Sequence, residues 1–210
     1  MHRYQHPVTP AELNGPLAAL CSELATGRLP VYVDVRPLED APPDECFPLV
    51  ARHVASRGGS ALFGWTLWEL PGVFVEAEFH AVWRTPHGTF VDIAPKKRPV
   101  ARVLFLEDPD RSYAGRQVNN VRRAVSLDPN VSEYLGTFDA EFELLNRGIR
   151  AEQHGEIALV GEEAREFHGI QMRRAALFPH VLSAAGAIGP YTPCWCSSGR
   201  KVKWCHAVQE

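Results

Sequence analysis

The sequence has no apolar run that approaches the roughly 20 residues needed to span a bilayer, so it predicts no transmembrane helix. The N-terminal segment MHRYQHPVTP lacks the apolar centre of a secretion signal, and we therefore expect a cytoplasmic protein with no membrane partner. The excess of one charge sign is also small, because 22 basic and 25 acidic residues leave a formal net charge of -3. Any contact with nucleic acid must therefore be local.

Internal repeats and long low-complexity linkers are absent too, although 17 prolines and 16 glycines are spread along the chain. With 45% apolar residues, a chain of 210 residues is long enough for one sizeable core and an appendage. Three of the five cysteines lie close together near the C-terminus, beside a histidine. Cysteines grouped in this way indicate metal ligation in a reducing compartment more than disulfides.

Residues 45–95 hold most of the side chains that can perform chemistry. Cys46 opens a predicted helix that Asp44 can cap, and a helix N-terminus favours the thiolate form of a cysteine. Further along, residues 74–83 predict a strand, and a turn leads from it into a second strand. Counting back from this turn pairs about residue 81 with Asp92, so we expect His80 and Asp92 to be cross-strand neighbours.

A thiol, an imidazole and a carboxylate placed in this order are the parts of an activated nucleophile. The imidazole accepts the thiol proton, and the carboxylate orients the ring and stabilises the imidazolium. Cys46, His80 and Asp92 are therefore the catalytic candidates, with the backbone N–H of Cys46 as one donor to an oxyanion. The structural alternative is that Cys46 is a small buried hydrophobe and that His80 and Asp92 are ordinary core and loop residues.

The sequence motifs ECF, FHAVW and VDIAP resemble those of the transglutaminase-like branch of the papain-like superfamily, over about residues 44–97. This resemblance implies an α+β fold with a papain-like core of a helix and an antiparallel sheet. It also implies cysteine-dependent acyl chemistry on a small-molecule or peptide amide or a thioester, with hydrolysis, deamidation or acyl transfer as the outcome. Glu45 stands where that family usually has a small residue. The words GWTLWE and EAEFHAVW also resemble an uncharacterised group of bacterial proteins that end in a zinc motif.

Other residues near these candidates have two interpretations each. Glu76 and Glu78 share the predicted His80 face, and we expect them to pair with Arg84, Lys96 or Lys97; lining a pocket for a cationic substrate is the alternative. Residues 96–98 are expected to form a solvated strand edge. Trp65 and Trp68 are expected in the core, and walling a substrate groove is the alternative. Tyr32 is expected to be a half-buried strand residue, with an oxyanion donor as the less favoured role.

The chain divides into a predicted transglutaminase-like core (1–125), a helical extension (126–190) and a tail (191–210). In the core, a helix is expected to begin at Thr9 and a strand to cover 31–35. The basic segment 112–126 is expected to be a solvated loop, although it can instead cover the site or bind an anionic partner. The apolar period predicts helices over 130–146 and 161–183.

The tail contains the spacing C-x-C-x8-C-H, formed by Cys194, Cys196, Cys205 and His206. Three thiolates and an imidazole complete a tetrahedron, which predicts one structural Zn²⁺ with no open position for catalysis. The pattern resembles the SEC-C motif at the end of the preprotein-translocase motor ATPase and of many other bacterial proteins, with Ser197 in place of its first glycine. The resemblance implies a protein, ribosome or nucleic acid partner. A non-catalytic adaptor, built from a vestigial enzyme fold and this tail, is therefore the alternative to an enzyme.

Overall fold

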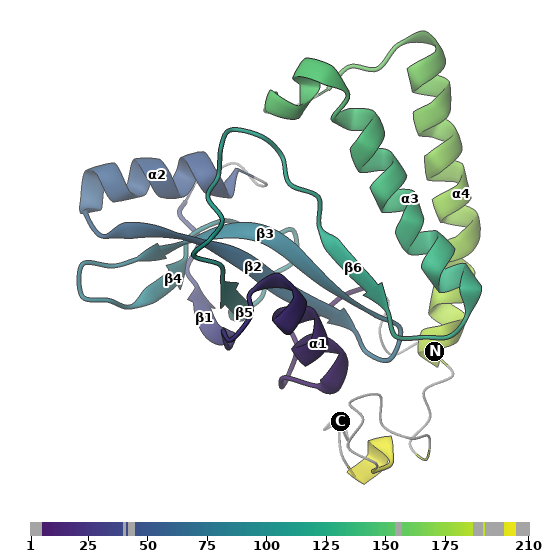
Figure 1. The fold of residues 1–210 in the computed structure, drawn as a ribbon, viewed down its shortest axis with the longest axis horizontal. Coiled ribbons are helices and arrows are strands. Elements are labelled where there is room, and N and C mark those ends of the chain that lie inside the picture. The colour runs from purple at the N-terminus through teal and green to yellow at the C-terminus, as the bar shows by residue number, and fades with distance from the viewer. Residues whose placement is uncertain are drawn as a thin grey trace.

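A computed structural model describes residues 6–39, 41, 45–153, 157–186, 191 and 200–204, and its fold is α+β (Figure 1). The helices of this part are α1 (Gly15–Leu24), α2 (Cys46–Arg57), α3 (Pro129–Leu145) and α4 (Gly161–Gly186), with short 3-10 helices at Gly148–Glu152 and Val202–Trp204. The strands are β1 (Val31–Val35), β2 (Ser60–Leu70), β3 (Phe74–Arg84), β4 (Phe90–Asp92), β5 (Arg102–Glu107) and β6 (Val121–Ala124).

Five of these strands close into a ring. The sheet has the order β2-β5-β1-β4-β3-β6, and β2 also pairs with β3. The long strands β2 and β3 pair along their whole length, from Ser60 opposite Arg84 to Leu70 opposite Phe74. β1 runs parallel to β4, whereas the other pairs are antiparallel. β6 joins β3 from outside the ring and extends the sheet.

The ring has an apolar interior and a separately packed outer face. Val33, Val82, Val103 and Phe105 are buried together inside, with side chains from β2 and β4 packed against them. Because side chains alternate along a strand, the neighbouring residues point outward. Trp65, Leu67, Ala77 and Phe79 form that outer layer with Leu17 and Leu20 of α1, while α2 packs its Leu49 and Val50 against Ala81 and Val91.

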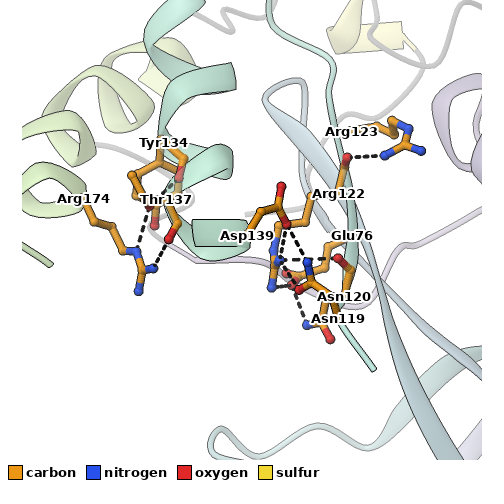
Figure 2. A network of polar contacts seen from close by, with 9 residues as sticks. All are labelled: Glu76, Asn119, Asn120, Arg122, Arg123, Tyr134, Thr137, Asp139 and Arg174. Atoms are coloured by element: carbon orange, nitrogen blue, oxygen red, sulfur yellow. Dashed lines mark hydrogen bonds and ion pairs between the residues drawn. The ribbon is translucent and has the colours of Figure 1, made fainter. Parts of the chain in front are cut away.

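The helices α3 and α4 lie side by side at the far end of β2 and β3 (Figure 1). Their apolar contact with the sheet joins Leu70 and Phe74 to Val131, Leu135 and Val181. A polar network also links them to β6 and β3, centred on Arg122 (Figure 2). Its guanidinium lies 2.9 Å from Glu76 Oε1, 3.7 Å from Asp139 Oδ1 and 4.7 Å from the centre of the Phe138 ring.

The structure confirms the predicted strands over 31–35 and 74–83 and the predicted helix over 161–183. The first helix was expected to begin at Thr9, which is wrong, because α1 begins at Gly15 with Asn14 as its cap. The segment 112–126 is not loop throughout, because β6 lies within it. Asp44, the expected cap of α2, lies outside the described residues. Within the described part of the chain, no helix is long and apolar enough to cross a membrane.

Candidate functional site

The site lies at an opening in the wall of the ring. β4 pairs with β3 at Trp83 and Arg84, and β6 pairs with it over residues 74–77. Among the described strands, none pairs with residues 78–82 along this edge of β3. The N-terminus of α2 reaches the opening, where the Phe47 ring lies 5.2 Å from the Phe79 ring. Cys46, the first residue of α2, is 8% exposed and packs in a cluster with Ala81 and Ala94.

His80 and Asp92 meet at this opening. Trp83 pairs with Val91, so Asp92 falls opposite Val82, one residue further along the ladder. The turn predicts a partner for Asp92 near residue 81, to within a residue or two, and the structure confirms that His80 and Asp92 are neighbours. Opposite Val82, Asp92 shares a face with His80, which is a diagonal neighbour. His80 Nε2 lies 3.0 Å from Asp92 Oδ2, and both side chains are buried.

A third residue, Lys96, completes this cluster. Its Nζ lies 2.7 Å from Asp92 Oδ2 and 3.1 Å from His80 Nε2, and its side chain is only 12% exposed. The other carboxylate oxygen of Asp92 accepts a hydrogen bond of 3.0 Å from the Ala94 N–H. Residues 96–98 were expected to be a solvated edge, which is wrong for Lys96. β4 ends at Asp92, the chain bends at Ala94, and Lys96 follows this bend.

The negative charge of Asp92 stabilises both basic groups of the cluster. Burial by itself lowers the pKa of His80, but the negative charges of Asp92 and Cys46 outweigh burial and raise the pKa to about 10. Burial likewise raises the pKa of Asp92, but His80 and Lys96 outweigh it and lower the pKa to about 2. An imidazolium beside a carboxylate is therefore the favoured state of the pair near neutral pH.

A groove of about 830 Å³ runs past the cluster. Cys46 and His80 both line it, so the structure brings these two candidates to one cavity. The same face of β3 contributes Glu76 and Glu78, and Trp68 of β2 lies beside them. Residues 6–11 and 94–102 supply the remaining sides.

An aromatic pair stands next to Cys46. The rings of Phe47 and Tyr113 stack with centres 4.0 Å apart and an angle of 5° between their planes. Burial first, and then the charges of Glu45 and Cys46, raise the pKa of Tyr113. Tyr113, in the connection between β5 and β6, therefore covers the Phe47 ring at the start of α2.

The remaining candidates fall into two groups. Trp65 is 1% exposed and belongs to the core as expected, whereas Trp68 lines the groove. Tyr32 donates a hydrogen bond of 2.8 Å to the Pro10 carbonyl and does not line the groove. The expected ion pairs of the two glutamates are wrong, because Glu76 pairs with Arg122 and Glu78 accepts a hydrogen bond of 2.9 Å from Trp68 Nε1.

The expected zinc ligands Cys194, Cys196, Cys205 and His206 all lie outside the described residues. Among the residues that the structure does describe, no group of three or more His, Cys, Asp or Glu side chains can hold a metal ion. Comparison with protein-family models, with curated proteins and with solved structures finds no match to this chain.

Proposed function

We propose that this chain is a thiol-dependent enzyme that attacks the carbonyl carbon of an amide or thioester, with a transglutaminase-like core. Cys46 is the nucleophile, His80 is the general base and later the acid, and Asp92 orients the ring. One observation carries the proposal: a buried His80–Asp92 pair, 3.0 Å apart, faces the same groove as a thiol at a helix N-terminus. Such a helix end, an imidazole and a carboxylate together stabilise a thiolate.

The two nitrogens of His80 have different roles in this proposal. Nε2 already contacts Asp92 and Lys96, so Nδ1 is the nitrogen left to exchange a proton with Cys46. The raised pKa of His80 suits the ring as acceptor of the thiol proton of Cys46, and this transfer gives a thiolate and an imidazolium.

The reaction then runs in two stages. The Cys46 thiolate adds to the carbonyl carbon, and the tetrahedral adduct collapses as the leaving nitrogen or sulfur takes the proton from His80 Nδ1. This leaves a thioester between the acyl group and Cys46. Water or an amine gives a proton to His80 and attacks this thioester, which releases the acyl product and restores the thiolate and the imidazolium.

The start of α2 can stabilise the negative oxygen of each adduct. The first intrahelical bond of α2 runs from the Leu49 N–H to the Glu45 carbonyl, at 3.1 Å, and Pro48 has no N–H. The N–H groups of Cys46 and Phe47 therefore precede the helical ladder, and the helix dipole adds positive potential there. These two groups are our candidates for the oxyanion donors.

Alkylation by iodoacetamide at pH 6, followed by peptide mapping, tests the proposal. We expect Cys46 to react much faster than Cys21, because Cys21 is 3% exposed and burial raises its pKa to about 11. The fast reaction should disappear in His80→Ala. Slow labelling of Cys46 at equal rates in the parent protein and in His80→Ala would overturn the proposal of an enzyme and favour the non-catalytic adaptor.

We also propose that Cys194, Cys196, Cys205 and His206 bind one structural Zn²⁺. The donor set supports this, since three thiolates and an imidazole at the spacing C-x-C-x8-C-H suit tetrahedral zinc. The basic and aromatic residues between these ligands suit an acidic protein surface or nucleic acid as partner.

A further inference from the structure

We propose that Glu78 selects substrates that carry a positive charge a few bonds away from the reacting carbonyl. This inference rests on the proposed function, because it takes the reacting carbonyl to lie beside Cys46 and His80. The substrate class is an amide or thioester with an ammonium or guanidinium group on its acyl side.

The two glutamates that line the groove differ in how their charge is balanced. Glu76 lies 2.9 Å from the guanidinium of Arg122 and accepts a hydrogen bond of 2.8 Å from Asn120 Nδ2. Glu78, in contrast, has one partner within the described residues, the indole N–H of Trp68 at 2.9 Å. An indole N–H is neutral, so it satisfies one lone pair of the carboxylate and leaves its negative charge uncompensated. A cationic group is what this half-buried carboxylate lacks.

Basic residues also face the groove, and their positions explain why they do not neutralise Glu78. Lys96 is held by Asp92 at 2.7 Å, and the guanidinium of Arg102 stacks over the Tyr32 ring at 3.9 Å. Lys97 and Arg98 are exposed, so water and salt screen their charges. The half-buried Glu78 carboxylate is less screened than these exposed charges, and it therefore has the stronger effect on the binding of a charged substrate.

The spacing along β3 fixes where the positive charge of the substrate must lie. Glu78 and His80 are two residues apart on one face of the strand, which separates their backbone positions by about 7 Å. An acyl chain of five methylenes between a carbonyl carbon and an ammonium spans a similar length. 6-Aminohexanamide therefore suits both groups, while hexanamide lacks the charge and adipamic acid reverses it.

Binding and turnover of these three amides test the proposal separately. Binding is measured by calorimetry on Cys46→Ala, which has no nucleophile, and turnover by ammonia release from the intact chain. Glu78→Gln removes the charge while its amide oxygen still accepts from Trp68. Glu107→Gln is the matched control, because it removes one negative charge from a residue outside the groove.

We expect 6-aminohexanamide to bind about tenfold more tightly than hexanamide, and adipamic acid more weakly than either. In Glu78→Gln the cationic and neutral amides should bind equally, with an unchanged melting temperature, whereas Glu107→Gln should keep the preference. Equal binding of the two amides to the parent protein, or a preference that survives in Glu78→Gln, overturns the inference. A charge preference in binding that Glu78→Gln abolishes supports the inference even where none of the three amides is turned over, and the labelling of Cys46 then decides whether the chain is an enzyme. Turnover without a charge preference supports the enzyme and overturns the inference.

Discussion

The ammonium of Lys96 lies 2.7 Å from Asp92 Oδ2, the same oxygen that lies 3.0 Å from His80 Nε2. Asp92 Oδ2 therefore contacts both the ammonium of Lys96 and the imidazole of His80. His80 Nε2 is also 3.1 Å from Lys96 Nζ, so this contact is a hydrogen bond only when the ring proton is on Nδ1. When the ring is an imidazolium, the two cations oppose each other, and Lys96 favours release of the proton.

Replacing Lys96 by methionine should therefore shift the alkaline part of the pH dependence of Cys46 reactivity to higher pH. The charge of Lys96 works against the factors that raise the pKa of His80, so its removal should raise that pKa further. We also expect kcat to fall about tenfold as Asp92 loses a partner that orients it. Rates of Cys46 alkylation between pH 6 and pH 11 measure the shift. The exposed Arg98→Met serves as control, and an identical profile in both variants would contradict the role of Lys96.

The stability of the protein should fall as pH rises from 6.5 to about 10. The pKa of His80 is raised from its ordinary 6.5 to about 10 in the folded state, so the folded protein holds a proton that the unfolded chain has lost. Its stabilising effect is complete below pH 6.5 and lost through pH 10, at a slope of up to about 1.4 kcal/mol per pH unit. Urea unfolding measures it, and Asp92→Asn should flatten the curve.

The same pair predicts a second loss of stability in acid. The pKa of Asp92 is lowered from 3.8 to about 2, so its contribution is present above pH 3.8 and disappears as pH falls to about 2. An acid unfolding curve for His80→Gln should show a smaller component, because the main partner of the carboxylate is gone and only Lys96 remains. Superimposable acid curves would show that Asp92 gains nothing from His80.

Gly64→Ala should destabilise the protein by about 1–3 kcal/mol through overpacking inside the ring. A Cβ at this position would lie 2.1 Å from the Leu106 carbonyl oxygen and 2.8 Å from Phe105 Cζ, so β2 and β5 would have to separate. Gly136→Ala in α3 is the control, because its Cβ would meet nothing within 4 Å and should stabilise the helix by about 0.5–1 kcal/mol. Denaturant midpoints of the two variants should move in opposite directions.

Arg122→Gln should destabilise the protein by about 2–3 kcal/mol, because it leaves the half-buried Glu76 without its cation. The side chain of Arg122 is 9% exposed, and it joins Glu76 of the groove to Asp139 of α3 (Figure 2). Its neighbour Arg123 is 50% exposed and pairs with Glu23, so Arg123→Gln should change stability by less than about 1 kcal/mol. Similar thermal unfolding of the two variants would contradict a structural role for the network.

The purified chain should contain close to one zinc ion, as measured by atomic emission. The double variant Cys194→Ser/Cys205→Ser should contain none, because two of the four ligands lose their thiolates. Cys21→Ser is a suitable control, since Cys21 is a core cysteine in the cluster with Leu17 and Leu20. Zinc retained by the double variant would contradict the proposed ligands.

Local sequence patterns predicted the elements of the site and the contact between His80 and Asp92, but not the closure of the ring. The helix at Cys46 and the strand bearing His80 follow from caps, turns and alternating apolar residues, which are local features. Ring closure depends instead on pairs such as Val31 with Phe105 and Trp65 with Leu106, which no local pattern encodes.

Lys96 illustrates the same limit on a smaller scale. A short basic run at a strand end is usually solvated, but Lys96 follows a bend at Ala94 and its ammonium lies 2.7 Å from Asp92 Oδ2. The exact register between β3 and β4 has the same limit, because the composition of the turn predicts the partner of Asp92 only to within a residue or two. In the structure, the Thr85 N–H bonds to the Thr89 carbonyl at 2.8 Å and fixes the pairing that follows.

The position of β5 within the ring also has a consequence during synthesis. Cys46, His80 and Asp92 all emerge from the ribosome before β5, yet β5 is the strand that lies between β1 and β2. Until Arg102–Glu107 has been made, the ring cannot close between β1 and β2, and Trp65 and Leu67 of β2 lack their partners on β5. We therefore expect the ring to close only after the fifth strand has left the ribosome, when all three candidate residues have already been made.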